Sequence, residues 1–293
     1  MKTYLTKKPK NMEDITNTQT IVISNSKIKT LQVLNFLFFV IMVTMNGLAI
    51  GLPLNGKTTK ELSDKYPNLF VPAGITFSIW SVIYLMLLIF CIYQIRSLFS
   101  KSPEPHLAMI LNAIGYLFVL NATFNALWII AWHYEILPLS ILLMSGILAT
   151  LVQINKNLRP VQPYLSGGLK VVMKAAFGLY FGWICIAAIA NATALLVAYG
   201  IMPTSLSGQS WACIMILVGS SIGFISTINV RNGFVGLAII WALIGIIIAR
   251  NQDIIYYKYI VYSAGFGILM MISAMLMGST IQMFTRKKVL IKE

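Results

Sequence analysis

The sequence predicts an all-α integral membrane protein with about eight transmembrane helices, and three observations carry this prediction. First, 58% of the 293 residues are hydrophobic and only 10% are charged, whereas a soluble domain carries about 25% charged residues. Second, apolar segments of about 20 residues, long enough to cross a bilayer as a helix, recur from residue 31 onwards. Third, Lys and Arg are distributed unevenly among the segments that connect them.

The N-terminal part of the chain begins with residues 1–30, which are polar and basic and which we expect to form a flexible tail. This tail and the apolar segment after it are too long for a secretory signal peptide, so residues 31–51 are expected to stay as the first span. The span ends in Gly47 and Gly51, a small-xxx-small spacing that favours close helix packing. Residues 52–73 then form the longest loop between spans.

Seven further apolar segments have a similar length. We expect these spans at residues 74–95, 108–132, 136–154, 175–199, 211–229, 232–249 and 258–281. The chain shows no internal repeat and leaves no stretch long enough for a soluble domain.

The basic residues indicate the orientation of these spans. With eight spans and the N-terminus inside, 17 of the 22 Lys and Arg residues fall in segments on the inner side. Because inner loops of membrane proteins carry the excess of Lys and Arg, both termini are predicted to be cytoplasmic. The same distribution explains the formal net charge of +14 without a nucleic-acid partner.

Several function classes are disfavoured by what the spans lack. No Asp or Glu lies in the middle of a span, which argues against a proton-driven pump and an intramembrane aspartyl protease. The three Cys residues have no metal-ligand spacing, so neither a disulfide nor a metal site is expected. His133 follows a span end and is read as interfacial, with an axial haem ligand as the alternative. No nucleophile–base pair is found, so no catalytic residues and no enzyme activity are expected.

The most informative stretch lies in the third span. At about 100° of rotation per residue, Asn121, Asn125, Trp128 and Trp132 fall within a sector of about 60° on one helix. An unpaired amide in hydrocarbon costs several kcal/mol, so this stripe should face protein or a cavity. The amides then either bond neighbouring helices, with the indoles packed beside them, or line a ligand pocket.

Two other spans carry related patterns. The fifth span places Ala187 and Asn191 on a narrow strip flanked by Trp183, and the buried amide there needs a partner. The second span places Trp80 and Tyr84 one helical turn apart. Aromatic residues at that spacing serve either as packing or as the wall of a binding site.

Three motifs in these spans together resemble the tryptophan-rich sensory protein family (TspO/MBR, the translocator proteins). The stretch Pro72-Ala-Gly-Ile-Thr-Phe-Ser-Ile-Trp80-Ser-Val-Ile-Tyr84 is similar to the start of that family's second helix. Asn125-Ala-Leu-Trp128 resembles its Asn-x-x-Trp motif in the third helix, with Trp132 where the family often has Phe. The fifth span, Trp183-x-x-x-Ala187-Ala188-x-x-Asn191, resembles its Trp-x-x-x-Ala-Ala-x-x-Asn motif.

The resemblance covers residues 31–200 and implies a five-helix core, followed by three additional spans over 201–285 and a basic tail over 286–293. It also implies a homodimer and a pocket between helices for a hydrophobic small molecule such as a porphyrin or haem-type tetrapyrrole, with residues 52–73 as lid. No cofactor is required, and the expected location is a bacterial plasma membrane. The candidate ligand-binding residues are Trp80, Tyr84, Asn121, Asn125, Trp128, Trp132, Trp183, Ala187 and Asn191.

The sequence departs from the family pattern at two places. Gly74 stands where the family usually has an aromatic residue, two positions after Pro72. Tyr199 is not followed by the basic residue of the sterol-recognition pattern. Two alternatives to a ligand-binding sensor or translocator stay open: a carrier for a neutral or amphipathic solute, and a structural membrane subunit without ligand.

Overall fold

The computed structural model describes residues 25–52, 54–100 and 104–290, and within them every regular element is helical. The helices are α2 (Asn25–Gly51), α3 (Thr59–Lys65), α4 (Ile79–Ile95), α5 (Pro105–Ile114), α6 (Leu117–His133), α7 (Leu137–Leu158), α8 (Gly167–Ala198), α9 (Gly208–Val230), α10 (Gly233–Asn251) and α11 (Lys258–Leu290). Short 3-10 turns occur at η1 (Leu54–Gly56), η2 (Gly74–Ser78) and η3 (Gln162–Tyr164).

The prediction of an all-α membrane protein with about eight spans is confirmed. Seven helices of the described residues are long and apolar enough to cross a membrane, and the bent pair α5 and α6 makes an eighth if it crosses as one span. Large apolar side chains such as Ile92 and Leu142 remain more than half exposed on the outside of the bundle. In a bilayer such side chains face lipid rather than water.

The boundaries differ from the predicted ones at both ends of the chain. The first helix begins at Asn25, so residues 25–30 belong to α2 rather than to the tail, and residues 1–24 lie outside the described residues. At the other end, α11 runs to Leu290 and includes most of the predicted basic tail. Lys and Arg do not interrupt a helix once it has left the membrane, because both residues have good helix propensity.

The third span, predicted over 108–132, is bent in the structure. It is broken between Ile114 and Leu117, where α5 and α6 meet at an angle of 55°. The cause is Gly115, whose φ of +53° is disfavoured for residues with a Cβ and ends the helical hydrogen-bond pattern. The sequence analysis did not predict this break, because hydropathy continues unchanged through it.

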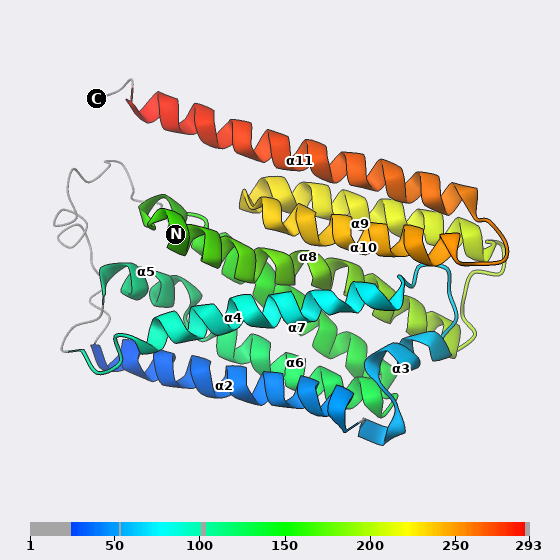
Figure 1. The fold of residues 1–293 in the computed structure, drawn as a ribbon, viewed down its shortest axis with the longest axis horizontal. Coiled ribbons are helices and arrows are strands. Elements are labelled where there is room, and N and C mark those ends of the chain that lie inside the picture. Colours follow the sequence, from blue (N-terminus) through cyan, green and yellow to red (C-terminus); the bar gives the residue numbers. More distant parts are fainter. Residues whose placement is uncertain (1–24, 53, 101–103, 291–293) are drawn as a thin grey trace.

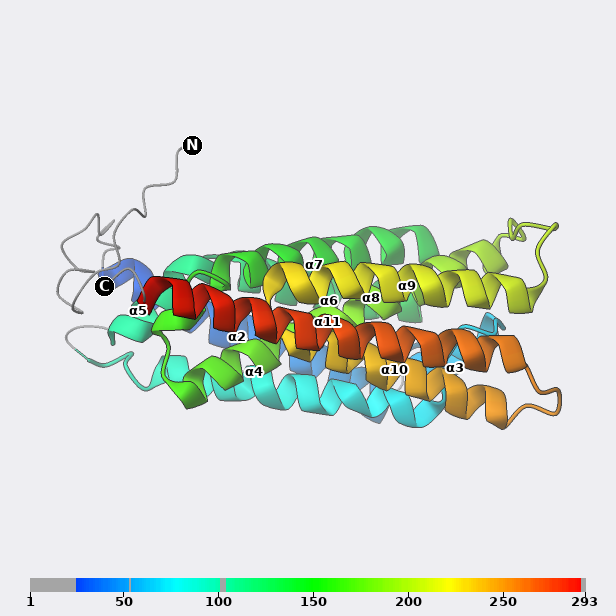
Figure 2. The same cartoon turned by 90° about the horizontal axis from the view of Figure 1, so that it is seen from above.

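The helices form one elongated bundle with α2 and α11 on opposite sides (Figure 1). Seen from above, the long helices run nearly parallel to the long axis, and α3 lies at the same end as the α8–α9 and α10–α11 connections (Figure 2). The C-terminal helices pack closely onto the rest of the bundle. A Cβ on Gly182 of α8 would lie 2.2 Å from the Val235 carbonyl oxygen of α10, so the two backbones are nearly in contact.

Candidate functional site

The nine candidate residues lie on three helices, and the five aromatic ones form two groups, Trp80, Tyr84 and Trp183 on α4 and α8, and Trp128 and Trp132 on α6. Trp80 stacks on Tyr84 with ring centroids 5.4 Å apart and an interplanar angle of 16°. The edge of Trp80 also meets Trp183 of α8 at 6.1 Å. On α6, Trp128 stacks on Trp132 at 6.1 Å. The α4 and α6 aromatics are therefore arranged as two stacked pairs.

Asn125 is fully buried and connects three helices. Its side-chain oxygen accepts a hydrogen bond of 2.7 Å from Asn46 of α2, and its amide nitrogen donates one of 2.8 Å to the Tyr180 hydroxyl of α8. Asn46 in turn donates to the carbonyl of Met42 one turn earlier. This buried network orients the Asn125 amide beside the aromatic residues.

Sequence reasoning missed two members of that network, Asn46 and Tyr180. A signal for each was present. Asn46 is an amide inside an apolar span, where it needs a partner. Tyr180 lies three residues before Trp183 and so shares its helix face. The edge of Trp80 also meets the Tyr180 ring, at 5.8 Å, which joins the network to the α4 aromatics.

Three buried polar groups of the cluster have no hydrogen-bond partner among the residues that the structure describes. They are the Tyr84 hydroxyl, the Trp128 indole nitrogen and the Trp183 indole nitrogen, one from each of α4, α6 and α8. The Tyr84 hydroxyl lies near enough to Asn125 to interact with it, but no hydrogen bond of good geometry joins them. A buried donor without a partner costs about 1–3 kcal/mol. These groups are therefore available to acceptor atoms of a ligand.

The other two candidate amides make bonds between helices, and both bonds go to α7. Asn121 donates to Thr150 at 2.8 Å and to the Ile147 carbonyl at 3.2 Å. Asn191 donates to Ser140 at 2.8 Å and accepts from the same hydroxyl at 3.2 Å. Ala187 is partly buried against the core. The two amides of α6 therefore point to different neighbours: Asn125 faces the aromatic cluster, and Asn121 faces α7.

The predicted lid, residues 52–73, contains the helix α3 and closes over the end of α6. Thr58 and Glu61 form a capping box that starts α3. The Trp132 indole nitrogen donates to the Thr59 carbonyl oxygen at 3.4 Å, which joins this helix to the stacked pair on α6. Tyr66 packs against Trp132 with ring centroids 6.2 Å apart.

Glu135, in the turn between α6 and α7, joins the lid to the bundle through its side-chain carboxylate. Glu135 accepts a 2.6 Å hydrogen bond from the Tyr66 hydroxyl, pairs with Lys65, and lies 3.5 Å from the Lys57 ammonium. Hydrogen bonds from Lys65 and Tyr66 lower the pKa of Glu135 from its ordinary value of 4.5 to about 2. We refer to Glu135, Lys57, Lys65 and Tyr66 as the lid clasp.

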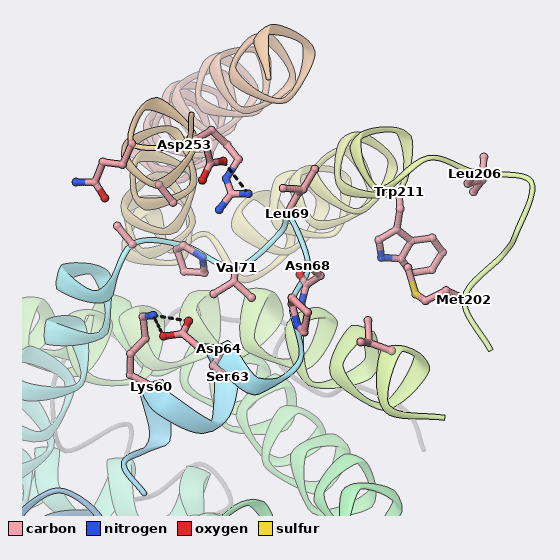
Figure 3. Close-up of a pocket in the computed structure, with 18 of the residues that line it drawn as sticks. Lys60, Ser63, Asp64, Asn68, Leu69, Val71, Met202, Leu206, Trp211 and Asp253 are labelled. Atoms are coloured by element: carbon pink, nitrogen blue, oxygen red, sulfur yellow. Dashed lines mark hydrogen bonds and ion pairs between the residues drawn. The ribbon is translucent and has the colours of Figure 1, made fainter. Parts of the chain in front are cut away.

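Two hollows among the described residues are lined by none of the nine candidates. The larger, of about 970 Å³, lies between the lid and the ends of α8, α9 and α10 (Figure 3). The smaller, of about 70 Å³, lies at the opposite end of α9 and α10. These two hollows are therefore separate from the candidate residues.

Comparison with known proteins gives one match. The model of the family described as TSPO-like protein matches residues 32–277, which includes α9, α10 and most of α11 as well as the first five spans. No curated protein and no solved structure matches the chain.

Proposed function

The chain belongs to the TSPO-like family, and from that premise we propose that it is a membrane sensor or translocator-like protein for a hydrophobic, tetrapyrrole-like small molecule. The proposed site lies between α4, α6 and α8, at Trp80, Tyr84, Asn125, Trp128 and Trp183. The integral membrane location follows from the apolar helices and from the family, and we propose a bacterial plasma membrane and a homodimer as its setting.

The observation that carries this proposal is the set of three buried donors without partners, surrounded by aromatic rings. Indole and phenol faces stack on a flat macrocycle, while N–H and O–H groups bond the polar atoms at its edge. The cost of leaving these donors unpaired in the empty protein is recovered when a ligand supplies acceptors. In a core with a purely structural role, we would expect such donors to have hydrogen-bond partners or to be replaced by apolar groups.

Each residue has a distinct part in this proposal. Trp80 and Trp128 provide stacking faces, because each belongs to a stacked pair that a flat ligand can enter. Asn125 orients an edge group of the ligand and is itself held by Asn46 and Tyr180. Asn121 and Asn191 hold α6 and α8 against α7. The lid gives access, since Thr59 and Tyr66 contact Trp132.

The test is a titration of the purified protein with protoporphyrin IX, followed by quenching of tryptophan fluorescence. We expect saturable quenching in the wild type and at least tenfold weaker binding in Trp80→Leu. Trp211→Leu is the matched control, because Trp211 at the start of α9 lines the larger hollow and is not a residue of the cluster. Equal binding in both variants would place the ligand elsewhere. No binding in the wild type would favour the carrier alternative, which flux into proteoliposomes would then test.

A further inference from the structure

The larger hollow lies at the end of the bundle that the distribution of Lys and Arg predicts to be on the outer side of the membrane. Its walls come from the lid and from the ends of α8, α9 and α10, which are the ends of predicted spans (Figure 3). The hollow is therefore at the level of the lipid head groups. Trp211, at the start of α9, lines it, and Trp is typical of this interface.

A buried arginine faces this hollow with unused hydrogen-bonding capacity. The Arg250 side chain is only 10% exposed, and its Nε has no hydrogen-bond partner. Its Nη1 lies 3.2 Å from Asp253 Oδ2, but the ion pair has no hydrogen bond of normal geometry, so the carboxylate oxygen is also unpartnered. Arg250 and Asp253 thus form an ion pair at the wall of a hollow of about 970 Å³, and the Arg250 Nε and the Asp253 Oδ2 make no hydrogen bond among the described residues.

The charges around the hollow are balanced. Its charged lining residues are two cations, Lys60 and Arg250, and two carboxylates, Asp64 and Asp253. Each cation has a carboxylate beside it, so a simple anion would meet repulsion as well as attraction. A molecule that carries both an oxyanion and an ammonium matches this pattern. Leu69, Val71 and Leu206 add an apolar wall that suits a hydrocarbon portion.

We propose that this hollow binds a zwitterionic phosphoethanolamine head group. The phosphate accepts from Arg250, the ammonium donates to Asp253, and the attached apolar part lies against the lid and the α8–α9 connection. The site is separate from the aromatic cluster, because none of its lining residues belongs to that cluster. It is formed where the lid meets the ends of α8, α9 and α10.

The experiment uses the full-length protein, freed of lipid in detergent and titrated by native mass spectrometry. The probes are dioleoyl phosphatidylethanolamine and dioleoyl phosphatidylglycerol, which share acyl chains and differ in the ammonium. We expect one phosphatidylethanolamine per chain, bound at least tenfold more tightly than phosphatidylglycerol. Arg250→Gln should weaken this binding at least tenfold. Lys258→Gln is the control, because Lys258 is a cation at the same end that does not line the hollow.

Gly74→Phe provides a second variant in case Arg250→Gln folds poorly. Gly74 lines the hollow, and a Cβ there would meet only Lys60 Cε, at an ordinary 3.5 Å, so a side chain can begin at this position without a clash. It should occupy the hollow and reduce phosphatidylethanolamine binding at least tenfold. Equal binding of the two lipids, or full binding by Gly74→Phe, would overturn the proposal. Displacement by free phosphoethanolamine would identify the head group alone as the ligand, and its failure would identify the intact lipid; either result upholds the site.

Discussion

The lid clasp gives the most quantitative prediction. Glu135→Gln removes the charge that pairs with Lys57 and Lys65 while keeping the size of the side chain. The pKa of Glu135 lies at about 2 instead of 4.5, and each pKa unit corresponds to about 1.4 kcal/mol, which gives at most about 3.5 kcal/mol. Because Glu135 is 23% exposed and its lysine partners are 41% and 47% exposed, solvent screening reduces this to about 1–2 kcal/mol.

Such a loss should raise the population of the open lid about 5- to 30-fold. Hydrogen exchange of the α3 backbone amides measures this population directly. We expect faster exchange by that factor in Glu135→Gln, with no change in α7 or α8. Asp64→Asn is the matched control, since Asp64 pairs only with Lys60 of the same helix in the part of the chain that the structure describes.

The pH dependence follows from the lowered pKa. A carboxylate with a depressed pKa stabilises the closed lid above its ordinary value of 4.5, and this stabilisation is lost as the pH falls towards about 2. After correction for intrinsic exchange rates, the wild type should therefore approach the Glu135→Gln variant across this range. Equal protection of α3 in the two proteins at neutral pH would refute the reasoning.

Two further predictions concern helix packing. Gly182→Ala places a Cβ against the Val235 carbonyl oxygen, so α8 and α10 must separate. Thermal unfolding in detergent should then show that the protein has lost about 1–3 kcal/mol of stability. Gly47→Ala is the control and should show no such loss, because a Cβ there has no described atom within 4 Å. Ser140→Ala leaves the Asn191 amide without its partner and should cost about 0.6–2 kcal/mol in the same assay. Unchanged affinity for protoporphyrin IX in this variant would support a purely structural role for Asn191, and loss of affinity would contradict it.

The span count and the family could be predicted from the sequence because hydropathy and short motifs are local properties. The bend at Gly115 could not, since a glycine within an apolar segment is compatible with a straight helix. The start of α3 in the lid could have been predicted from the sequence, because Thr58 and Glu61 have the spacing of a capping box.

The candidate site was only partly predictable for a different reason. The stripe on α6 was visible in the sequence, but Asn121 and Asn125 are only 40° apart on a helical wheel. Which of them faces α7 and which faces the aromatic cluster depends on the neighbouring helices, which the sequence does not specify. The contribution of Asn46 likewise depends on α2 packing beside α6.

This difference between two amides of one helix provides the most direct test of the proposed site. Asn121→Leu and Asn125→Leu each remove a buried amide that bonds other helices, so both should lower thermal stability. In a protoporphyrin IX titration, we expect Asn125→Leu to bind at least tenfold more weakly and Asn121→Leu to bind like the wild type. Equal affinities in the two variants, in a wild type that binds, would contradict a pocket at Asn125.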